Sequence, residues 1–366
     1  MKRVLQVVDS MDMGGIQAFI MNVYRNIDKE NIQFDFLVFR SHEQVFEKEI
    51  LSLGGKMYKL PGRRDGLLKN KQAIRKFFDE HPEYTVIHYN TSSLSDIGAL
   101  IEAARRNIPV RIIHSHSTKA PGSKIHTYIH RFNKRRIEKY ATHYLACGKL
   151  AADWFYKGTS IIDKVIIVNN GIACSDFQFD AENREIVRKA LGLQENFVIG
   201  HVGRFSEVKN HRFILQVFNA FVKKYPAMNP KLMLVGNGEL FDEMKTLAVE
   251  LNIDYNVLFL GTRHDIPDLL QAMDVMIMPS HYEGFPVTLV EAQAAGLPCV
   301  VSNTITKDAV IKDNVIMKSL EDDVEDWSKS IAENTNRFVE NDLLVKSGFD
   351  IQSTVNQLIT IYGFRR

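Results

Sequence analysis

The stretch "FVIGHVGRFSEVKNH", residues 197–211, decides the fold class. Its first six residues form an apolar run typical of a buried strand, and Gly203 ends that run. A helix is predicted to begin a few residues later, near Asn210. A buried strand, a glycine turn and a helix, repeated along a chain, predict a parallel sheet with helices on its faces.

This unit recurs through both halves of the chain. Apolar, β-rich runs alternate with helix-like segments, and we predict strands at residues 4–8, 34–39, 85–89, 110–114, 142–147, 197–202, 231–235, 257–260, 274–278 and 299–301. The fold class is therefore α/β, with two doubly wound parallel sheets. The turn of Asn169, Asn170 and Gly171 separates the halves and is a candidate hinge, so we predict domains at residues 1–169 and 170–366. Residues 324–366 have a helical pattern and are predicted to pack helices against one or both domains.

Length and composition exclude several classes of protein. With 366 residues, 45% hydrophobic and 25% charged, the chain is globular and long enough for two domains. The first predicted strand begins at Val4 and no apolar run approaches the roughly 18 to 20 residues of a membrane span, so we expect a soluble cytoplasmic protein that is at most peripheral to a membrane. The three cysteines lie far apart, which argues against a zinc cage or a disulfide framework.

Charge is unevenly distributed. Residues 1–168 carry 27 Lys and Arg against 17 Asp and Glu, whereas residues 169–366 carry 19 against 27. A basic first half indicates an anionic partner, and charge steering between the domains is the alternative. Residues 124–140, "KIHTYIHRFNKRRIEKY", predict one basic amphipathic helix that could contact an anionic membrane or could be an ordinary surface helix. Because no aromatic platform accompanies the basic residues, we do not expect a nucleic-acid partner.

Four strand-to-helix junctions of the second half carry the candidate chemistry. Arg204 and Lys209 follow the strand that ends at Gly203, and two cations beside a helix N-terminus predict a phosphate or diphosphate site. Gly236, Asn237 and Gly238 follow the next strand, where glycines either admit a ligand to the backbone or make a tight turn. Gly261, Thr262 and Arg263 form the third junction, with Asp265 as a candidate helix cap.

The fourth junction is "PSHYEGFPVTLVEAQAAG", residues 279–296, which places Glu283 on a loop and Glu291 inside an apolar helix. The carboxyl ends of parallel strands meet at one edge of a sheet, so all four junctions are expected at the same rim. A carboxylate in apolar surroundings requires either a basic partner or a ligand that carries hydroxyl groups.

The first half has its own candidate residues. Gly14 and Gly15 precede an amphipathic helix, but the Gly-x-Gly-x-x-Gly pattern of dinucleotide enzymes does not follow this strand, which argues against an NAD-dependent oxidoreductase. His114 and His116 end another strand and, by alternation, share one face of the sheet. Without a neighbouring cysteine or carboxylate, they do not predict a metal site.

Taken together, these motifs resemble glycosyltransferase family four, the retaining sugar-nucleotide transferases with two facing Rossmann-like domains of the GT-B type. The resemblance spans nearly the whole chain and rests on "EGFPVTLVEAQAAG" with its Glu-x7-Glu pair, "GRFSEVKN", "VGNGE", "FLGTRHD", "NNGIACSDF" and "GGIQ", in that family's order. In style the sequence is similar to bacterial capsular and exopolysaccharide enzymes. The family's linker motif usually has proline where this chain has Asn169.

The resemblance implies roles for individual residues. Arg204 and Lys209 would hold the donor diphosphate, Glu283 the transferred sugar, and Glu291 the ribose hydroxyls. His116 would position a donor or acceptor hydroxyl. The remaining implied binding positions follow the glycine-rich junctions and the loop after Glu283: Gly14, Gly15, Gly203, Gly236, Asn237, Thr262, Arg263, Gly284, Phe285, Pro286 and Val287.

The expected reaction is retaining, metal-independent transfer of a hexose or N-acetylhexosamine from a nucleotide-diphosphate sugar to a saccharide acceptor. UDP is expected as the nucleotide, with GDP next, and a lipid-linked acceptor would suit the basic helix. No resident cofactor is expected, because the nucleotide sugar is a substrate, and we expect a front-face attack because no carboxylate stands out as a covalent nucleophile. The alternatives are an epimerase or hydrolase of the same architecture, and a non-catalytic nucleotide-sugar binding protein.

Overall fold

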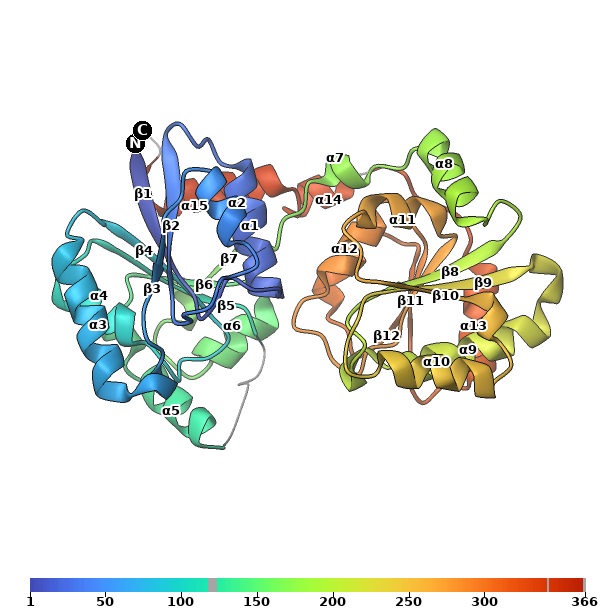
Figure 1. Ribbon diagram of the computed structural model, residues 1–366, viewed down its shortest axis with the longest axis horizontal. Coiled ribbons are helices and arrows are strands. Elements are labelled where there is room, and N and C mark those ends of the chain that lie inside the picture. The colour runs from blue at the N-terminus through green and yellow to red at the C-terminus, as the bar shows by residue number, and fades with distance from the viewer. Residues whose placement is uncertain (118–123, 341, 365–366) are drawn as a thin grey trace. The chain divides into compact units, whose positions relative to one another are not determined.

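The computed structural model describes residues 1–117, 124–340 and 342–364, and it divides into two compact units (Figure 1). The first unit contains Met1–Gly171 together with the C-terminal segment that begins at Ile351, and the second contains Ile172–Asp350. Each unit is built on its own parallel sheet with helices on both faces, which confirms the predicted α/β class.

The sheet of the first unit has the order β3-β2-β1-β4-β5-β6-β7, and every neighbouring pair is parallel. Its strands are β1 (Lys2–Val7), β2 (Ile32–Val38), β3 (Met57–Lys59), β4 (Val86–Thr91), β5 (Val110–Ser115), β6 (His143–Ala146) and β7 (Ile166–Ile167). Its α-helices are α1 (Gly15–Asn26), α2 (Glu47–Ser52), α3 (Leu67–Glu80), α4 (Gly98–Arg105), α5 (Lys124–Lys134), α6 (Lys149–Tyr156) and α15 (Ile351–Ile361).

The sheet of the second unit has the order β10-β9-β8-β11-β12-β13 and is also parallel throughout. Its strands are β8 (Phe197–Val202), β9 (Pro230–Val235), β10 (Val257–Gly261), β11 (Val275–Met278), β12 (Cys299–Ser302) and β13 (Val315–Lys318). Its α-helices are α7 (Cys174–Phe177), α8 (Ala181–Leu191), α9 (His211–Lys224), α10 (Phe241–Glu250), α11 (Ile266–Ala272), α12 (Val287–Ala294), α13 (Val324–Glu333) and α14 (Asp342–Lys346).

The C-terminal helix α15 belongs to the first unit, although it lies within residues 170–366, the predicted second domain whose tail helices were expected to pack against one or both domains. Figure 1 shows the red α15 beside the blue α1. Val355 and Leu358 of α15 and the following Tyr362 are buried, and the Thr354 hydroxyl donates to the carbonyl of Asn169 at 3.1 Å. The tail returns to the first unit because its apolar face is buried there.

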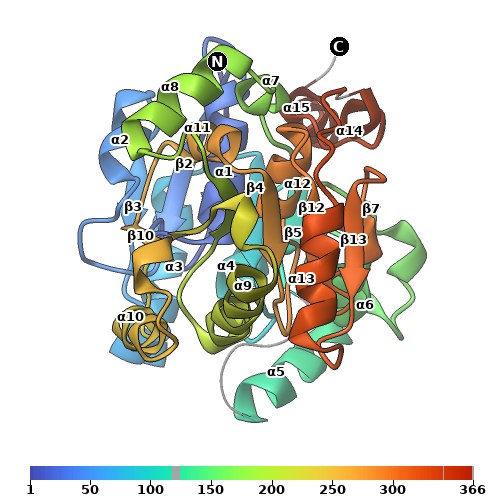
Figure 2. The same ribbon diagram turned by 90° about the vertical axis from the view of Figure 1, so that its right-hand side faces the viewer.

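Helices α13 and α14 stay with the second unit. Trp327 of α13 is fully buried, packs against Phe213 of α9, and donates from Nε1 to the Ser319 carbonyl at 2.8 Å. Figure 2 shows α9 and α13 side by side. The short strands β3 and β13, which were not predicted from the sequence, lie at outer edges of their sheets.

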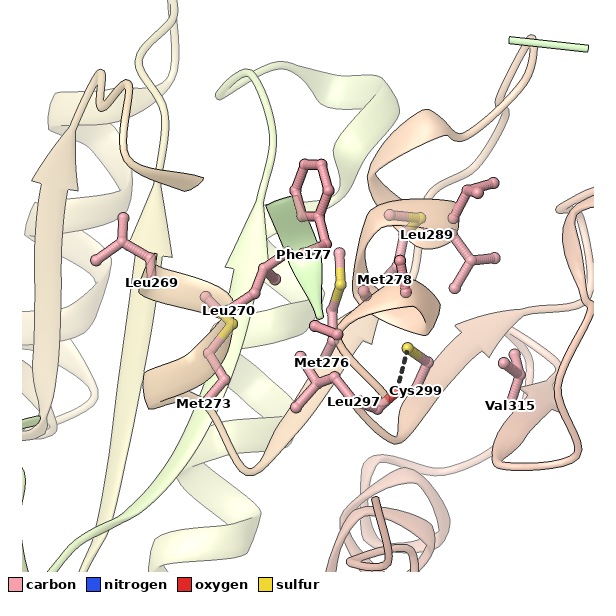
Figure 3. Close-up of a cluster of buried hydrophobic side chains, with 14 of the residues drawn as sticks. Phe177, Leu269, Leu270, Met273, Met276, Met278, Leu289, Leu297, Cys299 and Val315 are labelled. Carbon is pink, nitrogen blue, oxygen red and sulfur yellow. Dashed lines mark hydrogen bonds between the residues drawn. The ribbon is translucent and has the colours of Figure 1, made fainter. Parts of the chain in front are cut away.

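The core under α12 is made largely of methionine, leucine, valine and alanine side chains, together with Phe177 (Figure 3). Leu289 of α12 is fully buried in this core with Met276 and Met278 of β11, and the Cys299 thiol donates to the Leu297 carbonyl at 3.3 Å. The alanines of "EAQAAG" let α12 lie close to the sheet, as its apolar sequence predicts. A helix anchored in this way is a rigid support for the one acid that it carries, Glu291.

Candidate functional site

Hydrogen bonds join the ends of β8, β9 and β10 in the second unit. The Gly203 N–H donates to the Val235 carbonyl at 2.9 Å, and the Gly236 N–H donates to the Gly261 carbonyl at 2.8 Å. The Phe205 N–H, one turn further, donates to the Asn237 carbonyl at 3.0 Å. Three of the four predicted junctions therefore form one connected rim at the carboxyl edge of the sheet.

The glycines of "VGNGE" are needed for packing at this rim. A Cβ on Gly236 would lie 2.0 Å from the Gly203 carbonyl oxygen, and a Cβ on Gly238 would lie 2.4 Å from the Phe205 oxygen. The tight-turn alternative accounts for both glycines, because protein backbone occupies the space that a ligand would need. Gly261 differs, since a Cβ there would meet no atom within 4 Å.

The fourth junction is held to the first by an ion pair. Lys209 Nζ lies 2.6 Å from Glu283 Oε1, and the Ser280 hydroxyl donates to the same oxygen at 2.6 Å. Both charged side chains are largely buried, with exposed fractions of 20% for Lys209 and 10% for Glu283. The His281 N–H also donates to the Val208 carbonyl at 2.8 Å. The structure thus brings together two predicted site residues that lie 74 positions apart.

The two arginines of the site form exposed ion pairs instead. Arg204 Nη2 lies 3.1 Å from Glu239 Oε2, with exposed fractions of 73% and 54%. Arg263 binds Asp265 at 2.5 Å. Asp265 does occupy the N-cap position of α11, but its carboxylate makes no cap hydrogen bond and pairs with Arg263. Exposed pairs of this kind are worth about 0 to 1 kcal/mol, so either arginine can turn to a ligand at little cost.

Glu291 has neither a basic partner nor a hydrogen bond to its carboxylate in the part of the chain that the structure describes. Burial raises the pKa of this carboxyl group from 4.5 to about 7. The residue is partly exposed, whereas its helix neighbours Val290 and Ala292 are fully buried. Of the two explanations for this acid, a basic partner is absent from the described residues, and a ligand with hydroxyl groups stays a prediction.

The loop before α12 offers fewer backbone donors than the sequence predicts. Pro286 has no N–H group, and the Val287 N–H donates to the Phe285 carbonyl at 3.0 Å. The Phe285 ring stacks on the Phe349 ring, with their centroids 5.6 Å apart, so this side chain packs against another part of the second unit. Within the described residues, no protein acceptor binds the N–H groups of Gly284 and Phe285 in this loop or of Thr288 in the first turn of α12.

In the first unit, Gly14 and Gly15 lie exposed at the start of α1, where Gly14 is the N-cap residue. His114 and His116 share one face, as alternation predicts, with ring centroids 4.0 Å apart. His116 Nε2 lies 3.0 Å from Asn90 Oδ1, while His114 is fully buried and its Nδ1 contacts His88 Nε2 at 3.1 Å.

The basic helix predicted for residues 124–140 is shorter in the structure, and a different face of it is exposed. Helix α5 ends at Lys134, and His130 is buried rather than part of a basic surface. Its Nδ1 accepts from the Leu94 N–H at 3.0 Å, and burial lowers its pKa to about 4. The exposed face of α5 carries apolar side chains at helical spacing: Ile125, Tyr128 and Phe132, with exposed fractions of 68%, 73% and 52%.

The described residues form neither a cluster of metal ligands nor a membrane-spanning helix. Within residues 1–117, 124–340 and 342–364, no group of three metal-ligating side chains comes together. In the same part of the chain, no helix is long and apolar enough to cross a membrane.

Sequence reasoning missed Ser280, Asn90 and Tyr362, whose side chains contact predicted site residues or their neighbours. Ser280 lies inside the quoted "PSHYEGFP" and Asn90 at the end of a predicted strand, so position alone could have indicated these two. Tyr362 is far from the site in sequence, and no local signal points to it.

Comparisons with known proteins cover nearly the whole chain. Residues 13–176 match the family described as Glycosyltransferase Family 4, and residues 183–346 match Glycosyl transferases group 1. The chain is 34% identical to the putative glycosyltransferase EpsF of Bacillus subtilis (strain 168), over 99% of this chain and 96% of that protein. It is 24% identical to the UDP-Gal:alpha-D-GlcNAc-diphosphoundecaprenol alpha-1,3-galactosyltransferase of Escherichia coli, over 82% and 81% of the two chains.

The fold is also similar to that of solved structures. Anabaena Alr3699/HepE, in complex with UDP and glucose, superimposes with a TM-score of 0.79 at 19% identity, covering 99% of this chain and 100% of that one. At this identity the likeness shows the GT-B fold.

Proposed function

Because the chain belongs to glycosyltransferase family 4, we propose that it transfers a hexose or N-acetylhexosamine from a UDP-sugar to a saccharide acceptor, with retention of the anomeric configuration. The observation that carries the proposal is Glu291, a partly buried carboxylate on a rigid helix, without a partner among the described residues. Ribose hydroxyl groups are donors that would satisfy it.

The donor diphosphate would lie at the start of α12 and the end of β8. Arg204 can leave its exposed pair with Glu239, and the unused N–H groups of Gly284, Phe285 and Thr288 favour an anion at this helix N-terminus. A departing UDP gains negative charge on its phosphate, and preorganised cations and N–H donors stabilise that charge. We propose that these groups do so without a metal ion.

Lys209 and Glu283 would act as a pair. Lys209 and Ser280 both bind Oε1 of Glu283, and Oε2 accepts no hydrogen bond from the described residues. The pair therefore fixes the carboxylate and leaves one oxygen for a hydroxyl of the transferred sugar. Lys209 at the same time contributes positive charge to the rim where the leaving group would form.

A UDP-sugar is favoured over a GDP-sugar by two relatives. The E. coli relative uses UDP-Gal, as its name states, and the Anabaena structure holds UDP and glucose. The name of the E. coli relative also specifies a diphosphoundecaprenol-linked acceptor and an α-1,3 linkage. We propose a lipid-linked saccharide acceptor for this chain as well, in surface polysaccharide biosynthesis.

The test is calorimetric titration with UDP, GDP, ADP, CMP and dTDP. We expect UDP to bind most tightly and Arg204→Gln to weaken it by about 10- to 100-fold, the effect of losing a hydrogen bond to a charged group. Arg212→Gln is the matched control, because Arg212 also forms an exposed ion pair, with Glu243, near the start of α9. Equal losses in both variants, or no preference for UDP, would contradict the proposed donor site.

Turnover then separates transfer from the alternatives. Incubation of the enzyme with UDP-hexoses should release little free or epimerised sugar until an acceptor is added. NMR of the new glycosidic bond should show the anomeric configuration of the donor. Rapid acceptor-independent release would favour a hydrolase or epimerase.

Contact with an anionic membrane would bring the enzyme to such an acceptor. Helix α5 exposes Ile125, Tyr128 and Phe132 and carries Lys124 and Arg131 among its exposed cations, a combination typical of interfacial helices.

We expect the protein to sediment with vesicles that contain anionic lipid, and the double variant Ile125→Ser/Phe132→Ser to lose most of this binding. Val249→Ser/Tyr255→Ser is the control, because Val249 and Tyr255 are exposed apolar residues of the second unit, at 58% and 89%. Unchanged sedimentation of the α5 variant would refute the membrane contact.

A further inference from the structure

A row of polar side chains crosses the buried centre of the first sheet. Gln6 of β1 is in register with His88 of β4, and Asn90 of β4 is in register with His114 of β5. All four are between 0% and 1% exposed, and Tyr362, which follows α15 and is 2% exposed, contacts Gln6 and His88. Buried polar groups are costly unless they are hydrogen-bonded, so the direction of each hydrogen bond here is constrained.

The orientation of the Asn90 amide is set by the backbone. Its Nδ2 lies 3.2 Å from the His88 carbonyl oxygen, which can only accept, and 2.9 Å from Gln6 Oε1. The NH2 group must therefore point to these two oxygens, and Oδ1 must point to His116. Because Asn90 Oδ1 can only accept, the His116 Nε2 atom at 3.0 Å carries the hydrogen of this bond.

A neutral imidazole has one N–H and one acceptor nitrogen, and the proton on Nε2 leaves Nδ1 of His116 as an acceptor. Burial lowers the pKa of His116 to about 3, which keeps the ring neutral near pH 7. No hydrogen bond from the described residues reaches Nδ1.

We infer that Asn90 is a positioning residue that locks His116 in the tautomer with Nε2 protonated, so that Nδ1 is reserved to accept a hydrogen bond from a substrate hydroxyl. The inference rests on the proposed function for the identity of that substrate, a sugar donor or its acceptor. Asn90 acts only through His116, since its own polar atoms are all used within the protein.

The other end of the row provides a control. The Gln6 NH2 donates to the Tyr362 hydroxyl at 3.4 Å, and the same hydroxyl lies 2.9 Å from His88 Nδ1. His88 Nε2 lies 3.1 Å from His114 Nδ1, and the row ends at His114 Nε2, which is buried and has no hydrogen-bond partner among the described residues. Removing the Tyr362 hydroxyl therefore affects His88 and His114 but leaves the Asn90–His116 bond in place.

The decisive experiment is NMR of the full-length protein with 15N-labelled imidazole rings, with His116 assigned through His116→Gln. We expect the wild-type His116 spectrum to show a protonated Nε2 and an unprotonated Nδ1. Tyr362→Phe should keep this pattern. Asn90→Asp should also keep the proton on Nε2, because an acceptor oxygen remains at residue 90. Asn90→Leu should give a mixture of the two tautomers. A wild-type His116 protonated on Nδ1 would overturn the inference even if neither Asn90 variant folds.

Kinetics supply the functional outcome. We expect Asn90→Leu to lower kcat by about 10- to 100-fold, as for a misplaced catalytic contact, with UDP affinity unchanged because the proposed nucleotide contacts belong to the second unit. Full activity of a folded Asn90→Leu would overturn the positioning role. Absence of transfer by the wild type would count against the proposed function instead, and the tautomer result would still stand.

Discussion

Replacing Glu291 with glutamine should stabilise the free protein and weaken its binding of UDP. Burial raises the pKa of this carboxyl group from 4.5 to about 7, so the folded state favours the protonated form. The free energy of unfolding therefore falls as pH rises from about 4.5 to about 7 and levels off above that. Over this interval the cost of the ionised form reaches at most about 3 kcal/mol, since one pKa unit corresponds to 1.36 kcal/mol and partial exposure reduces the effect.

Glutamine has nearly the same shape and no charge. We expect Glu291→Gln to differ from the wild type by less than about 1 kcal/mol at pH 5 and to exceed its free energy of unfolding by about 1 to 3 kcal/mol at pH 8. The chain contains two tryptophans, Trp154 in the first unit and Trp327 in the second. Urea denaturation in a Trp154→Phe background, followed by the fluorescence of Trp327, reports on the unit that carries Glu291.

The binding of UDP should change in the opposite direction. An ionised carboxylate that accepts ribose hydroxyl groups contributes about 1.5 to 3 kcal/mol, so we expect Glu291→Gln to bind UDP about 10- to 150-fold more weakly at pH 8. Wild-type affinity should rise as pH increases through about 7, because the ribose stabilises the ionised form.

Glu291→Gln also serves as the control for titration of the UDP phosphate itself, since that titration changes the UDP affinity of both proteins in the same way. Equal stability of the two proteins at pH 8, together with equal UDP affinity, would refute the reasoning about this carboxylate.

Further substitutions test packing and charge in the second unit. Lys209→Met should destabilise the second unit by about 3 kcal/mol, because it leaves the Glu283 carboxylate largely buried and unpaired. The double variant Lys209→Met/Glu283→Gln should recover most of the stability without restoring transfer. If Lys209→Met alone were as stable as the wild type, the ion pair would be contradicted. Gly236→Ala should prevent stable folding, because its Cβ would lie 2.0 Å from the Gly203 carbonyl oxygen. Gly261→Ala has open space around it and should lower the free energy of unfolding by only about 1 kcal/mol, because its backbone is left-handed. If the two variants gave coinciding melting curves by circular dichroism, the clash at Gly236 would be relieved in the folded protein. Arg337→Met removes a guanidinium that donates to four carbonyl groups, so it should lower the free energy of unfolding by about 3 kcal/mol or more. Urea denaturation measures this change. A loss below about 1 kcal/mol would count against these hydrogen bonds.

Local patterns determined much of this protein. The alternation of apolar strands with amphipathic helices predicts two parallel sheets. Helices on both faces of such a sheet bury the apolar strands and the apolar face of each helix. The apolar run around Glu291 already shows that this acid lies in apolar surroundings, and the order of the motifs resembles one family, whose models match most of the chain.

Only the tertiary structure decided which distant residues meet. Lys209 binds Glu283 across 74 positions, and Gly236 faces the Gly203 backbone rather than open space. The unit to which α15 belongs and the direction of the Asn90 amide likewise depend on neighbours from other parts of the chain. Spacing along a sequence predicts which face of an element is buried, but a hydrogen bond or an ion pair depends on atomic positions within a few tenths of an ångström, which only the packed elements set.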